Sequence, residues 1–261
     1  MKHELRLFFI ALQFLTRVPV PRWVGFEPAW LQACARHFPL VGCFVGGVSA
    51  AVLWAGHALF TPIVAALLAI VASVLLTGAF HEDGLADTCD ALGGSVSRER
   101  ALAIMKDSRI GAYGAVGLVL MLGLKAATLA SLPLAAALPA LLLAHTASRL
   151  APVLLIRWLR YAGDIEHAKA KPLAQQASNV DVAVAAAWVA ALALALLMWQ
   201  PAWRAPIVAS LFAATLGLLW CKQWLRKRLG GYTGDTLGAT QQITELLLLL
   251  GWLGALRLST A

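Results

Sequence analysis

A short acidic stretch, residues 81–94, carries the residues in this chain that are best suited to do chemistry. It follows directly on a long apolar segment and contains no Lys or Arg. Four carboxylates fall within nine residues of it: Glu82, Asp83, Asp87 and Asp90. In a helix, the three aspartates are spaced i, i+4 and i+7 and share one face, where like charges repel unless a cation lies between them. The spacing predicts an oxygen-ligand site for Mg²⁺ or a similar hard cation. The alternative is an acidic, solvated first turn of a helix.

His81 and three glycines flank these acids. His81 is a candidate for orienting a ligand or taking a proton, and it fits an interfacial histidine equally well. Gly84 follows Asp83, and Gly93–Gly94 closes the run. Glycines there permit close approach of the backbone to a phosphate, or they only mark a turn.

The next segment, residues 98–114, is basic and predicts a short amphipathic helix that ends at Gly111. Lys106 and Arg109 are the nearest cations after the acids, so we expect them to neutralise a diphosphate held by the metal. The alternative is that they are only the positive charge that cytoplasmic loops carry.

A glycine- and threonine-rich segment, residues 230–245, enters the last apolar helix. Thr233 and Gly234 would lie at a helix N-terminus, where backbone N–H groups favour phosphate. Asp235 would complete the metal site, hold a substrate hydroxyl, or only cap the helix. Gln241 and Glu245 are spaced i, i+4, so both would face one partner, which we expect to be substrate.

Three ionisable residues lie inside predicted membrane spans. Arg149, with His145 one turn before it, would reach a phosphate at the cytoplasmic end or extend its side chain to the inner interface. Lys125 lies ~21 Å along its helix from Gly111 at about 1.5 Å per residue. We therefore expect Lys125 to extend to the outer surface.

The composition predicts an all-α polytopic integral membrane protein that forms a single membrane domain, residues 1–261. The chain is 61% hydrophobic and only 13% charged, with a mean hydropathy of +0.77. We expect about seven transmembrane helices, each near the ~20 residues that a bilayer requires. Residues 1–20 would form a further interfacial or re-entrant helix. The predicted spans are about 38–57, 62–80, 111–131, 133–156, 182–199, 204–221 and 239–256.

Basic residues predict the orientation. They concentrate in the N-terminal segment and after the second, fourth and sixth spans, whereas the opposite connections near 58–61, 131–133 and 200–203 carry no charged residue. The N-terminus is therefore expected in the cytoplasm. Cytoplasmic loops at about 81–110, 157–181 and 222–238 would converge with the active site at that face. The net charge of +8 does not indicate nucleic acid, because it lies in these short loops.

These residues together suggest phosphoryl transfer at a membrane surface. The metal would neutralise a diphosphate on one nucleotide-activated substrate, and a carboxylate would activate the hydroxyl of a second. Asp90, Asp235 and His81 are the candidates for that catalytic base. Spacing alone identifies neither substrate.

Three motifs resemble the cobalamin synthase family, the adenosylcobinamide-GDP ribazoletransferases. They are His81-x-Asp-Gly-Leu-Ala-Asp-Thr-Cys-Asp90, Ile104-Met-Lys-Asp-Ser-Arg-Ile-Gly111 and Gly230-Gly-x-Thr-Gly-Asp-Thr-Leu-Gly-Ala239. Phe14-Leu-Thr-Arg-Val-Pro-Val-Pro21 and Phe38-Pro-Leu-Val-Gly42 are similar to that family too. The likeness spans nearly the whole chain.

The resemblance implies a Mg²⁺-dependent enzyme of the bacterial inner membrane. It would transfer adenosylcobinamide phosphate from adenosylcobinamide-GDP to the 3′-hydroxyl of α-ribazole or its 5′-phosphate. GMP would leave, and adenosylcobalamin or its 5′-phosphate would form. Asp83, Asp87 and Asp90 would bind the metal, with Asp235 as a further ligand or base. Glu82 matches the family pattern less well as a ligand. Association with other enzymes of the cobalamin pathway is a further expectation.

Two alternatives belong to other classes. The acid spacing is similar to that of CDP-alcohol phosphotransferases, which make phospholipids, but their Asp-Gly-x-x-Ala-Arg opening is absent because Ala86 is followed by Asp87. A corrinoid transporter or membrane scaffold would bind ligand without releasing GMP.

Overall fold

The computed structural model describes residues 2–25, 27–163 and 177–259, and its regular elements there are helices. One isolated β-bridge joins Tyr161 to Tyr232. The α-helices are α1 (Lys2–Leu15), α2 (Pro28–Ala33), α3 (Phe38–His57), α4 (Pro62–Thr77), α5 (Phe80–Leu92), α6 (Arg98–Ile104), α7 (Ala112–Ala130), α8 (Leu134–Ser148), α9 (Leu150–Trp158), α10 (Asn179–Trp199), α11 (Arg204–Leu229) and α12 (Gly234–Leu258). The all-helical prediction is confirmed for these residues.

Five helical segments in the described residues are long and apolar enough to span a membrane, or six if one bent pair counts as a span. The five segments are Pro28–His57, Ala112–Ala130, Leu134–Trp158, Asn179–Trp199 and Pro201–Leu229, and the bent pair is α4 with α5. This is fewer than the seven that were expected. The difference is the predicted span 239–256, which forms the second part of α12. That helix has the length, but its first three turns are rich in Thr, Gln and acidic residues.

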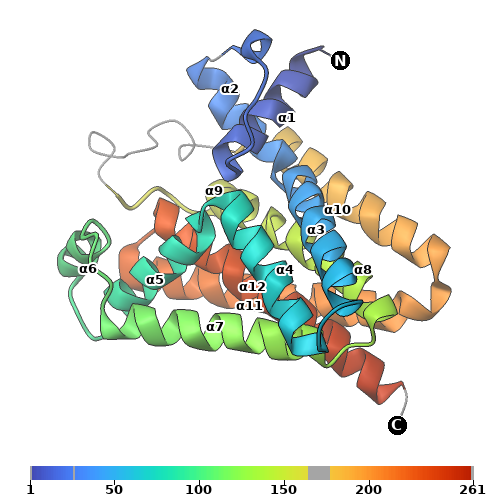
Figure 1. Ribbon diagram of the computed structural model, residues 1–261. Helices are drawn as coiled ribbons and strands as arrows, with labels where there is room; N and C mark the ends of the chain where they lie inside the picture. The colour runs from blue at the N-terminus through green and yellow to red at the C-terminus, as the bar shows by residue number, and fades with distance from the viewer. Residues whose placement is uncertain (1, 26, 164–176, 260–261) are drawn as a thin grey trace.

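The chain turns by 92° between α4 and α5, where the sequence suggested one continuous apolar run. Gly78 and Ala79 at the corner both have left-handed backbone angles, with φ of 70° and 59°. A Cβ on Gly78 would lie 2.4 Å from Nε of Arg17, and the backbone N–H of Arg17 donates to the carbonyl of Leu76 at 2.8 Å. The segment after α1 therefore closes over the corner. The turn redirects α5 to lie against α7 and α12 (Figure 1).

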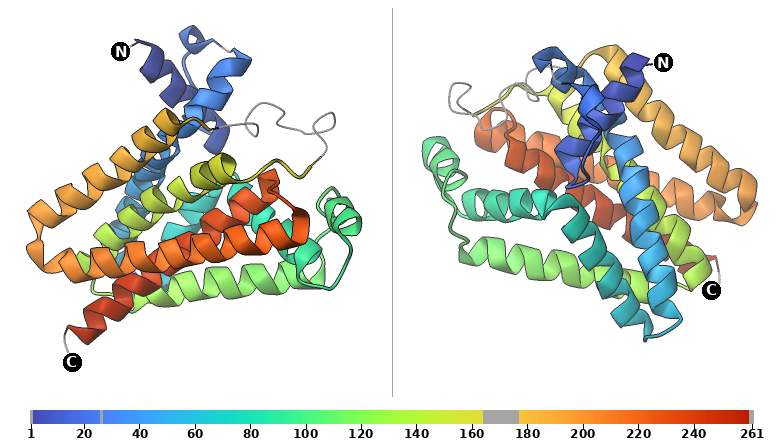
Figure 2. Two further views of the ribbon diagram at one scale, coloured as in Figure 1. Left: turned by 180° about the vertical axis from the view of Figure 1, so that it is seen from behind. Right: turned by 45° about the horizontal axis from the view of Figure 1, so that its top comes forward.

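Helix α12 is the centre of the bundle. It packs against α5, α7, α8, α9 and α11, as Figure 1 and the two views of Figure 2 show. Its Trp252 is fully buried in the largest apolar cluster, among alanines and leucines of α4 and α8. Helix α1 buries Leu7, Ile10 and Ala11 against α3 and the turn before it. Its expected interfacial position remains a prediction.

Candidate functional site

The described parts of the three predicted cytoplasmic loops meet at one end of the bundle. The N–H of Tyr232 donates to the carbonyl of Arg160 at 2.9 Å, and the N–H of Ala162 donates to that of Tyr232 at 2.8 Å. Arg98 joins the same group by donating to the carbonyls of Leu229 and Ala162, at 2.8 and 2.9 Å. Residues 164–176 of the middle loop lie outside the described residues. The described residues of the three loops therefore contact one another, and their place at a cytoplasmic active-site face remains a prediction.

Arg228 ties α11 to the end of the acidic helix. Its guanidinium donates to the carbonyls of Leu92 and Gly94, at 3.1 and 2.7 Å. Cations at the C-terminal end of a helix satisfy carbonyls that have no partner within the helix. At this end of the bundle, the basic residues of the loops therefore hold helix ends in place, besides any effect they have on topology.

The acidic stretch forms a single helix, α5, as the spacing predicted. Asp83 is exposed, and Asp87 and Asp90 are half-buried. A Cβ on Gly84 would lie 2.7 Å from the carbonyl oxygen of Asp235 and 3.0 Å from its Cα, so the backbones of α5 and α12 touch at this glycine. This contact brings the Gly/Thr-rich motif against the acidic motif between Asp83 and Asp87.

Asp90 caps the next helix of the bundle. Its two carboxylate oxygens accept from the N–H groups of Gly111 and Gly114, at 2.7 and 2.8 Å. Gly111 is the N-cap position of α7, not the end of a helix as predicted. The preceding helix, α6, is shorter than expected and stops at Ile104. Asp90 therefore satisfies N–H groups that the first turn of α7 cannot pair internally.

The predicted metal ligands do not converge in this structure. The described residues contain no group of three or more His, Cys, Asp or Glu side chains arranged to hold a metal ion. Glu82 is 9% exposed and directed into the bundle, whereas its neighbour Asp83 is exposed. The residue types still fit a hard cation, because the contact at Gly84 puts Asp235 beside the helix turn that bears Asp83 and Asp87.

The two cations predicted to bind a diphosphate both face solvent. Lys106 is exposed, and the Arg109 side chain is 86% exposed. Arg109 folds back onto Asp107, with Nη2 2.6 Å and Nε 3.0 Å from its carboxylate oxygens. These hydrogen bonds lower the pKa of Asp107 from 3.8 to about 2. The pair is therefore charged at neutral pH.

The N-terminus of α12 is capped by Thr233 and not by Asp235. The Thr233 hydroxyl accepts from the N–H of Thr236, and the Thr236 hydroxyl accepts from the N–H of Thr233. Gly234 is exposed, and a Cβ there would meet nothing within 4 Å among the residues that the structure describes. An open glycine at the start of a 25-residue helix suits an approaching anion.

Lys125 is not at an outer surface, which corrects the sequence expectation. It is 3% exposed, and its Nζ donates to Gln242 and to Glu245, at 2.6 Å in each case. The buried ammonium group of Lys125 is stabilised by the carboxylate of Glu245 on α12. The residue spacing within α7 does not reveal this partner. The available signal was a Lys and a Glu in separate apolar helices, each lacking a residue of opposite charge one turn away on its own helix.

Arg149, Gln241 and Glu245, predicted to bind substrate, are enclosed and bind protein groups. Arg149 lies at the break between α8 and α9, is 2% exposed, and donates to the carbonyl of His145 at 2.8 Å. It does not extend to the interface. Gln241 donates to Ser148 at 2.9 Å and to Glu245 at 2.5 Å. Nδ1 of His145 lies 3.2 Å from Glu245. Their role in substrate binding remains a prediction.

His81 is also buried, so it is not an interfacial side chain. It is 5% exposed, and its ring meets that of Phe80 edge-on at 5.4 Å. Its backbone lies against Gly238, where a Cβ would be 3.3 Å from the His81 Cα. Its position favours helix packing over contact with a soluble substrate.

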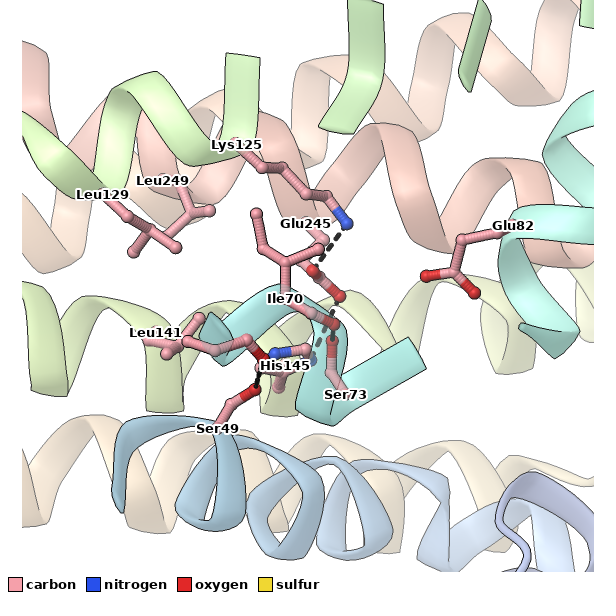
Figure 3. A pocket seen from close by; sticks show the side chains of 11 residues that line it. Ser49, Ile70, Ser73, Glu82, Lys125, Leu129, Leu141, His145, Glu245 and Leu249 are labelled. Atoms are coloured by element: carbon pink, nitrogen blue, oxygen red, sulfur yellow. Dashed lines mark hydrogen bonds and ion pairs between the residues drawn. The ribbon is translucent and has the colours of Figure 1, made fainter. Parts of the chain in front are cut away.

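A small cavity of about 10 Å³ lies within this polar region (Figure 3). We use the name polar core for the charged and amide side chains that line this cavity or hydrogen-bond to its lining residues: Glu82, Lys125, His145, Arg149, Gln241, Gln242 and Glu245. In Figure 3, Lys125 and Glu82 point into the region from α7 and α5, and Glu245 bridges Lys125 to His145.

Known proteins match this chain over nearly its whole length. A family model described as cobalamin-5-phosphate synthase matches residues 7–253. An adenosylcobinamide-GDP ribazoletransferase of Leptothrix cholodnii is 60% identical over 259 residues, which cover 96% of both chains. A protein of the same name from Polaromonas naphthalenivorans is 44% identical, over 95% of this chain and 97% of its own length. Another, from Vibrio cholerae, is 42% identical, over 96% of this chain and 94% of its own length.

No solved structure matches the chain. The family match spans all three motifs of the acidic, basic and Gly/Thr-rich segments, and it removes the reason for favouring a lipid synthase or a transporter. This chain belongs to the cobalamin-5-phosphate synthase family.

Proposed function

We propose that this protein joins adenosylcobinamide phosphate to α-ribazole or its 5′-phosphate. The names of its relatives and the family match support this activity. The 3′-hydroxyl oxygen of ribazole forms a bond to the phosphorus attached to cobinamide. The bond from that phosphorus to the oxygen bridging the two phosphates breaks, and GMP leaves with that oxygen. The proton of the hydroxyl passes to a base on the protein.

Asp83 and Asp87 hold Mg²⁺ in this proposal. Held by these two carboxylates, Mg²⁺ would supply positive charge for the diphosphate and for the leaving phosphate. The contact between α5 and α12 at Gly84 is the observation that carries the assignment, because it adds Asp235 to the same place. Asp235 takes the proton of the attacking hydroxyl. We prefer it to Asp90, whose oxygens cap α7, and to His81, which is buried.

The diphosphate binds at the open N-terminus of α12. The backbone at Gly234 approaches it closely, and Lys106 and Arg109 add positive charge from the neighbouring loop. The Thr233 hydroxyl lies 3.5 Å from the sulfur of Met105, which links this loop to the start of α12. We place this end of the bundle in the bacterial cytoplasm, with the N-terminus on the same side, because the connecting loops there are basic.

GMP release tests the proposal. Purified protein in detergent is mixed with adenosylcobinamide-GDP, Mg²⁺ and either α-ribazole or its 5′-phosphate. Asp87→Asn and the exposed control Glu99→Gln are measured alongside. We expect the wild type and Glu99→Gln to release GMP, and EDTA to abolish this release. In Asp87→Asn, the rate of GMP release should fall at least a hundredfold. A folded wild type that releases no GMP with either form of ribazole would refute the activity.

A further inference from the structure

Glu82 has one carboxylate oxygen, deep inside the protein, that has no partner among the described residues. Its Oε1 accepts from Nε2 of Gln242 at 3.0 Å, while its Oε2 is buried and accepts no hydrogen bond from them. A buried carboxylate oxygen left in this state costs free energy, so such atoms in folded proteins usually have a water or ion as partner. Glu82 also lines the small cavity of the polar core together with Lys125 and Glu245 (Figure 3).

The cavity has the size and the chemistry for one water molecule. Its volume of about 10 Å³ is close to the minimum that one water requires. Lys125 carries three N–H donors, of which two go to Gln242 and Glu245, so one remains for a water. The hydroxyls of Ser49 and Ser73 also line the cavity, and they donate to the carbonyls of Ala69 and Ile70 at 2.7 and 2.8 Å. Their oxygens can therefore still accept.

The charges around the cavity favour a water molecule over a divalent metal ion as the partner of the Glu82 carboxylate. Two buried cations, Lys125 and Arg149, face two buried carboxylates, Glu82 and Glu245. Arg149 interacts electrostatically with both of these acids. A divalent ion would add two positive charges to a buried group in which Lys125 and Arg149 already match the two carboxylates. Glu82 therefore differs in role from the exposed Asp83 beside it.

We infer that Glu82 is a positioning residue that shares one ordered water with Lys125. Through this water and through Gln242, Glu82 fastens the first turn of α5 to α7 and α12. Asp83 and Asp87 follow on the same helix, so the position of Glu82 sets where they lie. The inference rests on the proposed function for its effect on catalysis. The water and the coupling between Glu82 and Lys125 are independent of that function.

The test compares Glu82→Gln, Lys125→Met and the double variant in the full-length protein. Thermal unfolding is measured first. Glu82→Gln removes the charge of one partner of this water, and Lys125→Met removes the other partner. We therefore expect the melting temperature of the double variant to fall clearly less than the sum of the two single decreases. Additive losses would overturn the shared water. A high-resolution map of the wild type gives a second measurement: a water within hydrogen-bond distance of both side chains supports the inference, and an empty cavity refutes it.

GMP release per folded molecule separates positioning from other roles. We expect Glu82→Gln to lower kcat at least tenfold while the Mg²⁺ concentration for half-maximal activity stays within twofold. A tenfold rise in that concentration would make Glu82 a metal ligand instead.

The matched control is Arg36→Met, which breaks the largely buried ion pair between Arg36 and Asp181, 2.7 Å apart and away from α5. It should lose stability but keep kcat. A kcat of Glu82→Gln equal to that of the wild type would overturn the positioning role. If the wild type releases no GMP, the proposed function is refuted. The unfolding measurements would then still test the coupling between Glu82 and Lys125.

Discussion

At the scale of single residues, Asp90 shows how one carboxylate fits two interpretations. Its spacing with Asp83 and Asp87 indicates a shared ligand face, whereas its oxygens accept from two backbone N–H groups of α7. A carboxylate that caps a helix is held in place by these bonds, because the N–H groups would otherwise be unpaired. Its first effect is therefore on stability.

Asp90→Ala should lower the stability of the protein by roughly 0.5–2 kcal/mol, the range for loss of a helix cap. Asp90→Asn keeps one acceptor oxygen and should recover part of this loss. Thermal unfolding in detergent measures both, and activity per folded molecule should fall less in Asp90→Asn than in Asp87→Asn. Equal, complete loss of activity in both variants would return Asp90 to the metal ligands.

Arg109 and Asp107 allow a prediction about pH. The pKa of Asp107 is lowered from 3.8 to about 2. The stabilising interaction with Arg109 is therefore fully present above pH 3.8, the ordinary pKa, and it is lost as the pH falls through about 2. Between pH 5 and 9 the pair does not titrate. Any change in KM for adenosylcobinamide-GDP across that range must come from other groups.

Arg109→Gln should raise this KM about tenfold, which corresponds to one lost charge-assisted hydrogen bond. Asp107→Asn should not raise it, because that change releases the guanidinium from its neighbour. The comparison needs only steady-state kinetics at pH 7. A KM of wild-type value in Arg109→Gln would remove Arg109 from the binding site.

At the scale of helices, the contact between α5 and α12 positions the proposed site. Gly84 permits it, since a Cβ there would lie 2.7 Å from a backbone oxygen that cannot move aside easily. The corner at Gly78 and Ala79 then points α5 along α12. A single methyl group at Gly84 therefore tests whether the helix contact matters for catalysis.

Gly84→Ala should lower both the melting temperature and kcat, because α5 must shift away from Asp235. Gly123→Ala on α7 is the matched control, since a Cβ there meets nothing within 4 Å. It should keep full activity and gain up to about 1 kcal/mol of stability from better helix propensity. If Gly84→Ala has wild-type kcat, the two helices do not need this close approach.

At the scale of the whole molecule, the orientation can be measured from the two ends of α7. Ser108 lies in the basic loop before this helix, and Ser131 lies in the uncharged turn after it, and both are exposed. In intact cells, an impermeant maleimide should label Ser131→Cys, whereas Ser108→Cys should react only after lysis. The parent protein, with its four cysteines, gives the background. The reverse pattern would place the basic loops outside.

The sequence alone determined the features that depend on local composition. Apolar runs predict membrane helices because a bilayer requires about 20 apolar residues, and six of the seven predicted segments match apolar spans or the bent pair. The acidic helix and the position of the Gly/Thr-rich segment at a helix start also follow from spacing along the chain. The three motifs carried the family resemblance for the same reason.

The tertiary structure decided which residues meet across the bundle. Asp90 pairs with Gly114 across 24 residues, and Lys125 pairs with Glu245 across 120. Such pairs depend on how each helix is rotated and on the 92° turn before α5, which two left-handed residues and Arg17 produce. Spacing along one helix carries no information about the face of another. The sequence therefore identified the acidic motif, and only packing separated Glu82, directed into the polar core, from Asp83, exposed at the surface.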